Sequence, residues 1–136
     1  MAHIQDLRPN DITVMLGDKL RVIKYDLNAY AELEKRYGSV EKAMSTLQTG
    51  SLIGLRTILW AGLIHNEAIL DEVTGEPIGY NITPHLVGSW IEPSQMQKVS
   101  EKLSEAIVAT LPAADKKKAM KELEKLNIAD VSEKNV

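Results

Sequence analysis

One stretch of the chain, residues 52–64, limits the possible folds more than any other. Its large apolar side chains recur at spacings that cover almost the whole circumference of an α-helix. Such a helix is stable in water only where other elements cover it on most sides. The sequence therefore predicts a buried central helix from Ser51 to about His65. Its core-defining residues are Leu55, Leu59, Trp60 and Leu63.

The sequence on either side of this segment predicts further helices. All but the last begin after a good capping residue or a proline and end near a glycine or a proline, which are the usual start and stop signals. The expected helices cover about residues 27–37, 40–49, 84–91, 96–111 and 114–127. Residues 66–82 are rich in Gly, Asp, Glu, Asn and Pro, and we expect them to form one long irregular connection.

A β-hairpin is expected near the N-terminus. The β-prone runs Ile12–Leu16 and Leu20–Tyr25 flank a Gly-Asp pair that suits a tight turn. Because an isolated hairpin is marginal in water, this one must pack on the helices or pair with another chain. The predicted fold is mainly α, with an N-terminal β-hairpin followed by a compact bundle of about five to six helices.

Three regions are expected along the 136 residues, which suit a single domain. Residues 1–10 form a polar lead-in, residues 11–111 form the hairpin and helical core domain, and residues 112–136 form a C-terminal amphipathic helix and a polar tail. The polar start lacks the apolar core of a signal peptide, and the longest apolar run, residues 58–64, is too short to span a membrane. We expect a soluble cytoplasmic protein.

Charge argues against nucleic acid and anionic membrane as partners, because the net charge is −3. The charge is unevenly placed. No Lys or Arg lies between Arg56 and Lys98, and the acids of that stretch carry −5, which leaves +2 for the rest of the chain. This separation allows head-to-tail contact between copies, although solvated loop charge is the favoured interpretation.

No pattern of catalytic, cofactor, metal or small-molecule binding residues is found. The chain has no Cys and no glycine-rich phosphate loop. His65, Glu67, His85 and Glu92 could converge in space to form a metal or enzyme site, but surface or capping roles are favoured for both histidines. Arg56 is the one charge inside the most apolar helix. Its stem is expected to cover the core while its head reaches water, and an ion pair or a partner contact is the alternative.

Two apolar clusters are candidates for binding a partner. Trp90 and Ile91 lie on a short, proline-bounded helix, where a half-exposed Trp would anchor a partner; packing in the core is the alternative. Met120, Leu123 and Leu126 form a stripe on the last expected helix, of a kind that docks in grooves or receives apolar partners. Packing of that stripe on its own domain is the competing interpretation.

Three sequence segments together resemble those of one family. They are Tyr-Asp-Leu-Asn-Ala at 25–29, Leu-Glu-Lys-Arg-Tyr-Gly-Ser at 33–39 and Leu-Arg-Thr-Ile-Leu-Trp-Ala-Gly-Leu at 55–63. In this order, after a short β element and before two or three amphipathic helices, they resemble the tail assembly chaperones of long-tailed bacteriophages, prophages and gene-transfer agents. The resemblance spans roughly residues 20–111. Its motifs concern packing and carry no catalytic signature.

The resemblance implies a small helical protein that binds the tape measure protein, which is long, helical and rich in apolar surface. Such a chaperone keeps this client soluble in the cytoplasm of the bacterial host until tail-tube subunits polymerise around it, and it is absent from the finished virion. Self-association through the hairpin edge is also expected. The alternative is a structural component of the virion, such as a head–tail connector.

Overall fold

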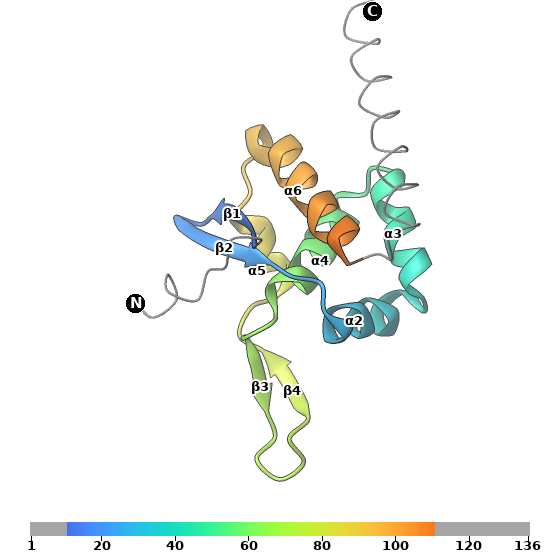
Figure 1. Ribbon diagram of the computed structural model, residues 1–136, viewed down its shortest axis with the longest axis vertical. Coiled ribbons are helices and arrows are strands. Elements are labelled where there is room, and N and C mark those ends of the chain that lie inside the picture. The colour runs from blue at the N-terminus through green and yellow to red at the C-terminus, as the bar shows by residue number, and fades with distance from the viewer. Residues whose placement is uncertain (1–10, 111–136) are drawn as a thin grey trace, which may run out of the picture.

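The computed structural model describes residues 11–110, which begin with the predicted hairpin (Figure 1). Strand β1 (Ile12–Leu16) pairs with the antiparallel strand β2 (Lys19–Ile23), and Leu16 lies opposite Lys19. Gly17 and Asp18 form the turn with φ of 56° and 65°, the positive values that a type I′ turn requires. The predicted Gly-Asp turn is therefore correct.

Five α-helices follow within the described residues, so the predicted mainly α fold with an N-terminal hairpin is confirmed. Four of the helices begin at a polar residue whose side chain accepts a backbone N–H of the first turn, as the sequence predicted: Asp26, Ser39, Ser51 and Thr83. The elements are α2 (Leu27–Tyr37), α3 (Val40–Gln48), α4 (Leu52–Leu63), α5 (Pro84–Ser89), the 3₁₀ turn η1 (Pro93–Gln95) and α6 (Met96–Ala109).

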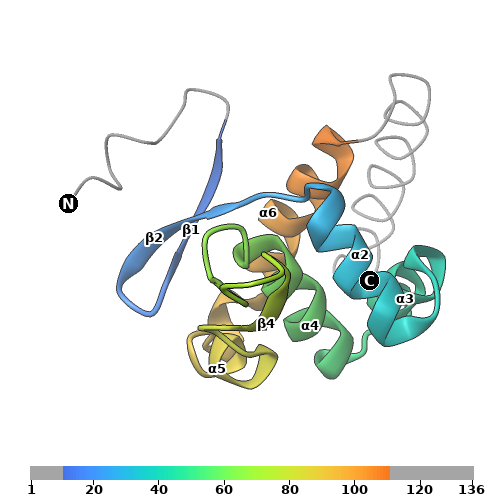
Figure 2. The same ribbon diagram turned by 90° about the horizontal axis from the view of Figure 1, so that it is seen from below.

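Helix α4 lies at the centre of the fold, with β2, α2, α3, α5 and α6 packed around it (Figure 2). Leu59, Trp60 and Leu63 are buried. The expectation of burial on most sides holds for the later turns and is wrong for the first, where Leu52 and Ile53 are exposed. Helix α3 covers one side of this turn, where Gly54 is buried against Thr46, and leaves Leu52 and Ile53 in contact with solvent. The helix also ends at Leu63, two residues before the predicted His65.

The β1–β2 hairpin packs on the helical body of its own chain. Its strands contact α4 and α6, and the Lys24 N–H donates to the Gly62 carbonyl oxygen over 2.8 Å. Beside this bond, the buried Tyr25 hydroxyl donates to the Ile58 carbonyl oxygen over 2.6 Å. Gly62 has no side chain, so α4 can approach Ile23 and Tyr25 closely.

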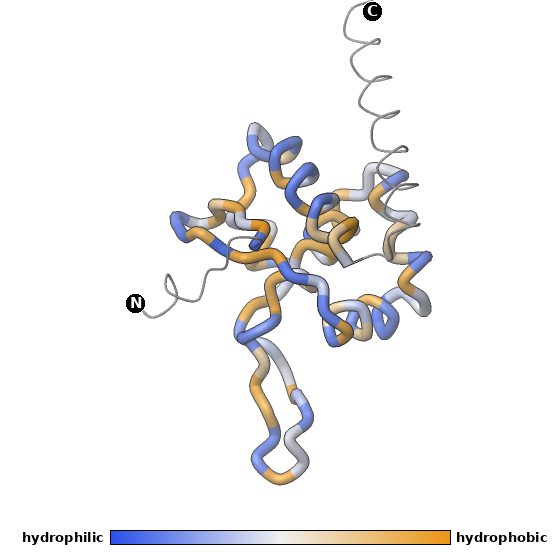
Figure 3. Tube along the Cα trace, in the orientation of Figure 1, coloured by the Kyte–Doolittle hydropathy of each residue, from blue (hydrophilic) through white to orange (hydrophobic). Residues whose placement is uncertain are grey.

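The segment expected to be irregular contains a second hairpin instead. Strands β3 (Ala68–Leu70) and β4 (Pro77–Tyr80) pair antiparallel and project away from the helices (Figure 1). We call residues 67–80 the arm. Its turn is held by the Asp71 carboxylate, which accepts the N–H groups of Val73 and Thr74, and by Gly75, whose φ is 73°. Hydrophobic residues lie along β3 and at the tip of the arm (Figure 3).

No helix within residues 11–110 is long and apolar enough to cross a membrane. The polar lead-in predicted for residues 1–10 lies outside the described residues. So do the C-terminal helix and tail predicted for residues 112–136, and with them Met120, Leu123 and Leu126.

Candidate functional site

An open apolar groove runs between the start of α4, helix α5 and the turn that leads into α6. Its volume is about 390 Å³. Aliphatic and methionine side chains form most of its wall, and the charged or polar groups are few. The lining residues are Leu52, Leu55, Arg56, His85, Gly88, Ser89, Ile91, Pro93 and Met96. We call this surface the α4–α5 groove.

Helix ends create the groove. Ser51 caps α4 by accepting the Gly54 N–H over 3.0 Å, so Leu52 begins the helix at the rim. Thr83 caps α5 in the same way, and α5 ends after only six residues at Ser89. The chain then turns through η1 before α6 begins. Because α5 is short, it covers the later turns of α4 and leaves the first turn open to solvent.

Arg56 gives the groove a permanent positive charge, because its guanidinium stays protonated at any ordinary pH. Its stem passes close to Gly88, where an added Cβ would lie 3.3 Å from Arg56 Cδ. Its Nε atom is buried and has no hydrogen-bond partner among the described residues. Within those residues Arg56 forms no ion pair with an acid. A guanidinium that is always protonated, and whose buried Nε has no partner within residues 11–110, favours a carboxylate or carbonyl oxygen brought by a bound molecule.

The two adjacent residues predicted to bind a partner point to different surfaces. Ile91 lines the α4–α5 groove. Trp90 packs against the β1–β2 turn, so close that a Cβ on Gly17 would lie 2.7 Å from its Cδ1 atom. The Arg21 guanidinium lies 3.7 Å from the Trp90 ring centroid and forms a cation–π contact with it. Trp90 therefore fastens the hairpin to α5, and a role of this partly buried ring in binding a partner stays a prediction.

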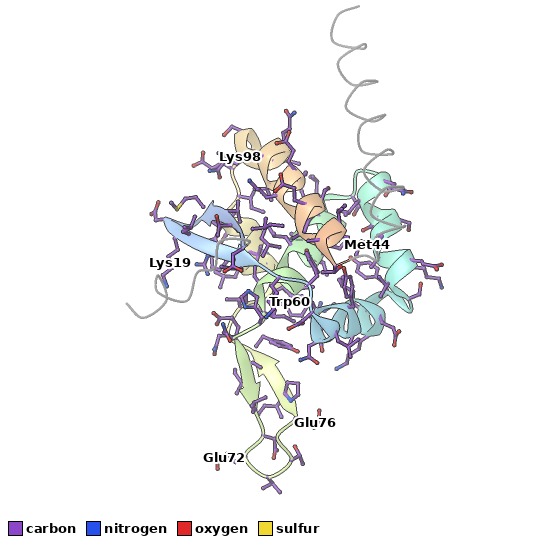
Figure 4. The ribbon with its side chains drawn as sticks, in the orientation of Figure 1. Lys19, Met44, Trp60, Glu72, Glu76 and Lys98 are labelled. Atoms are coloured by element: carbon purple, nitrogen blue, oxygen red, sulfur yellow. The ribbon has the colours of Figure 1, made fainter. Side chains whose placement is uncertain are left out.

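The four residues predicted to define the core differ in burial. Trp60 is the largest: its Nε1 donates to the Ile82 carbonyl oxygen over 2.8 Å, and its ring meets Tyr80 edge-on at 5.4 Å. It lies where the arm joins the helices (Figure 4). Leu59 and Leu63 are buried with it. Leu55 is only partly buried, because it lies on the first turns of α4 and lines the groove.

The histidines and acids considered for a metal or enzyme site do not gather. His65 Nε2 lies 2.9 Å from the Val22 carbonyl oxygen, at the edge of β2, whereas His85 lies in the wall of the α4–α5 groove. Between residues 11 and 110, no three His, Asp or Glu side chains are placed to hold a metal ion.

A smaller apolar depression of about 250 Å³ lies between α2, α3 and the end of α6. Tyr30, Val40, Met44, Ile107 and Thr110 line it, and Figure 4 labels Met44. Burial raises the pKa of Tyr30, whose hydroxyl hydrogen-bonds to Thr110 Oγ1. This depression lacks the charged side chain that distinguishes the α4–α5 groove, which is therefore the stronger candidate.

The sequence singled out Ile91, which lines the groove, but did not predict the groove itself. The sequence pattern predicts core positions for Leu52 and Leu55, because their spacing matches that of the buried positions further along α4. Arg56 carried a signal, as the single charge in the most apolar helix. Comparison with protein-family models, curated proteins and solved structures finds no match to this chain.

Proposed function

We propose that this protein is a tail assembly chaperone of a long-tailed bacteriophage, prophage or gene-transfer agent. It binds the tape measure protein and keeps it soluble in the bacterial cytoplasm during tail assembly, and it does not enter the finished virion. The observation that carries the proposal is the α4–α5 groove, an open apolar surface beside an exposed apolar helix end. The resemblance of residues 25–29, 33–39 and 55–63 to that family supplies the identity of the client.

The groove suits a helical client. An amphipathic helix binds such a surface by laying its apolar side chains at i, i+3, i+4 and i+7 between the walls. Leu52, Leu55 and Ile91 would contact those side chains, while Arg56 would pair with a carboxylate on the same helix. Such binding needs no catalytic group, and it covers the apolar surface that otherwise drives a long helical protein to aggregate.

Co-expression tests the proposal. The full chain is produced together with the large helical protein encoded just downstream, and the fraction of that partner in the supernatant is measured. We expect the partner to become soluble and to co-purify. A partner that stays in the pellet while this chain purifies alone would refute the proposal.

A pair of matched variants locates the client-binding surface. Leu52 and Leu27 are both the first residue of a helix, and they are 63% and 83% exposed. Aspartate at either position suits a helix N-terminus, so both variants should fold. Loss of one buried Leu contact weakens binding by about 1.5–3 kcal/mol, which is roughly tenfold to a hundredfold. We expect Leu52→Asp to leave most of the client insoluble and Leu27→Asp to behave like the wild type.

A structural virion component, such as a head–tail connector, is the second candidate. The projecting arm favours it, because subunits that remain in a particle must reach their neighbours. Mass spectrometry of purified virions separates the two candidates. A chaperone is missing from the particle, and a connector is present in several copies.

A further inference from the structure

We propose that the arm of one copy docks on the outer face of the β1–β2 hairpin of a second copy, so that copies associate head to tail. This contact is distinct from the α4–α5 groove and does not depend on the proposed client.

The arm exposes more apolar surface than a free hairpin should. Val73 is 93% exposed and Ile78 is 70% exposed, and Ile69 and Leu70 are exposed beside them. In the described part of the chain, the backbone of neither β3 nor β4 approaches another helix or strand. The arm is anchored at its base, where the Tyr80 ring meets Trp60. A two-stranded hairpin of this kind is marginal in water until another surface covers it.

The charge of the arm defines what can cover it. Glu67, Asp71, Glu72 and Glu76 lie in the arm, and the sequence holds no Lys or Arg between Arg56 and Lys98. Glu72 and Glu76 lie near the tip of the arm (Figure 4). A docking surface must therefore offer apolar contact together with positive charge.

The β1–β2 hairpin has both properties. Val14 and Leu16 point into the core, so the alternate residue Met15 points outward, and it lies opposite Leu20. Met15 and Leu20 are both exposed. Lys19 and Lys24 are exposed at the two ends of β2 and flank this apolar pair, whereas Arg21 lies opposite Val14 on the inner face and stacks on Trp90. With Asp18 counted, residues 12–24 carry three cations and one acid, a net charge of +2. In the described residues each of the two hairpins is a separate two-stranded sheet, so neither has a third strand at its edges.

The contact has to join two molecules. The arm and the β1–β2 hairpin leave the helices in different directions (Figure 1), and neither β3 nor β4 approaches β1 or β2, so the arm does not lie on its own hairpin. Because the two surfaces are different, each contact leaves one arm and one hairpin unused, and further copies can add. The matching side chains are few, so each contact is small and association depends on protein concentration.

Two charge variants of the full chain test the proposal in sedimentation velocity without client. The arm variant is Glu72→Lys with Glu76→Lys, and the hairpin variant is Lys19→Glu with Lys24→Glu; all four side chains are exposed. We expect the wild type to form larger species as its concentration rises, and 1 M salt to weaken them. Each variant alone should stay monomeric, because its arm and hairpin no longer have opposite charges.

Mixing the two variants gives the decisive result. The mixture pairs the unaltered arm of the hairpin variant with the unaltered hairpin of the arm variant, so we expect 1:1 complexes to return. As a matched control for the arm variant, Glu34→Lys with Glu101→Lys makes the same change in net charge at exposed helix positions. It should leave association intact. Circular dichroism verifies that each variant is folded. A wild type that is monomeric at every concentration would overturn the proposal, and so would a mixture that stays monomeric.

Discussion

Replacing Gly62 by alanine should destabilise the fold, although alanine is the better helix residue. Gly62 lies in the last turn of α4, where its carbonyl oxygen accepts the Lys24 N–H and holds the hairpin to the helix. A Cβ at this position would lie 2.8 Å from Ile23 Cγ2 and 2.8 Å from Tyr25 Cζ. Ordinary carbon–carbon contacts are about 3.5–4.0 Å, so both side chains would have to retreat.

Two opposing effects set the magnitude. Alanine gains about 1 kcal/mol over glycine from helix propensity. Overpacking a core costs about 1–3 kcal/mol. The Tyr25 ring cannot retreat freely because its hydroxyl is bonded to the Ile58 carbonyl oxygen at 2.6 Å, and losing that bond costs about 0.5–1.5 kcal/mol more. We therefore expect Gly62→Ala to lower the free energy of unfolding by about 0.5–3.5 kcal/mol.

Urea unfolding followed by circular dichroism measures this change. Gly88→Ala in α5 is the matched control, since its nearest contact, at 3.3 Å, is with the flexible stem of Arg56. That variant should be as stable as the wild type or slightly more stable. A Gly62→Ala protein with an unchanged or raised unfolding midpoint would refute the close approach of helix and hairpin described here.

Two further predictions concern pH. Burial raises the pKa of the Tyr25 hydroxyl well above 10.0, so its contribution to stability is complete below pH 10.0 and is lost as the pH rises towards the folded-state pKa. Tyr25→Phe should cost about 0.5–1.5 kcal/mol at neutral pH and flatten the alkaline loss of stability, and an unchanged pH–stability curve would contradict this. The backbone N–H groups of Thr74 and Val73 lower the pKa of Asp71 below 3.8, so the carboxylate stabilises the arm turn above that pH and stops doing so as the pH falls through the folded-state pKa. The amide NMR signals of residues 73 and 74 should shift with a midpoint below pH 3.8, and a midpoint above 3.8 would show that the turn lacks these bonds.

The helices were predictable because their start signals are local. Asp26, Ser39, Ser51 and Thr83 each accept an N–H of the turn that follows them, so a short sequence window contains the whole interaction. The type I′ turn of the first hairpin is equally local.

The arm was not predictable from the alternation of apolar and polar residues. Alternation arises when one face of a strand is buried. The side chains of β3 are all exposed, so burial leaves no pattern in its sequence. The informative signal was the turn itself, with Asp71 and Gly75 four residues apart between two short apolar runs.

The groove depends on where helices end in space. Leu52 and Leu59 have the same periodic signature, yet one is exposed and the other is buried, because α5 stops at Ser89 and leaves the first turn of α4 uncovered. The contact of Trp90 with the turn at Gly17 likewise joins segments that are distant in the sequence, and no local sequence pattern predicts it.

Hydrogen exchange on the complex with the tape measure protein tests the central claim most directly. If the client occupies the α4–α5 groove, the amides of residues 52–56 and 85–96 should become protected when it binds, and the amides of the arm should exchange as they do in the free protein. Protection confined to the arm or to α2, with no change around the groove, would contradict the claim.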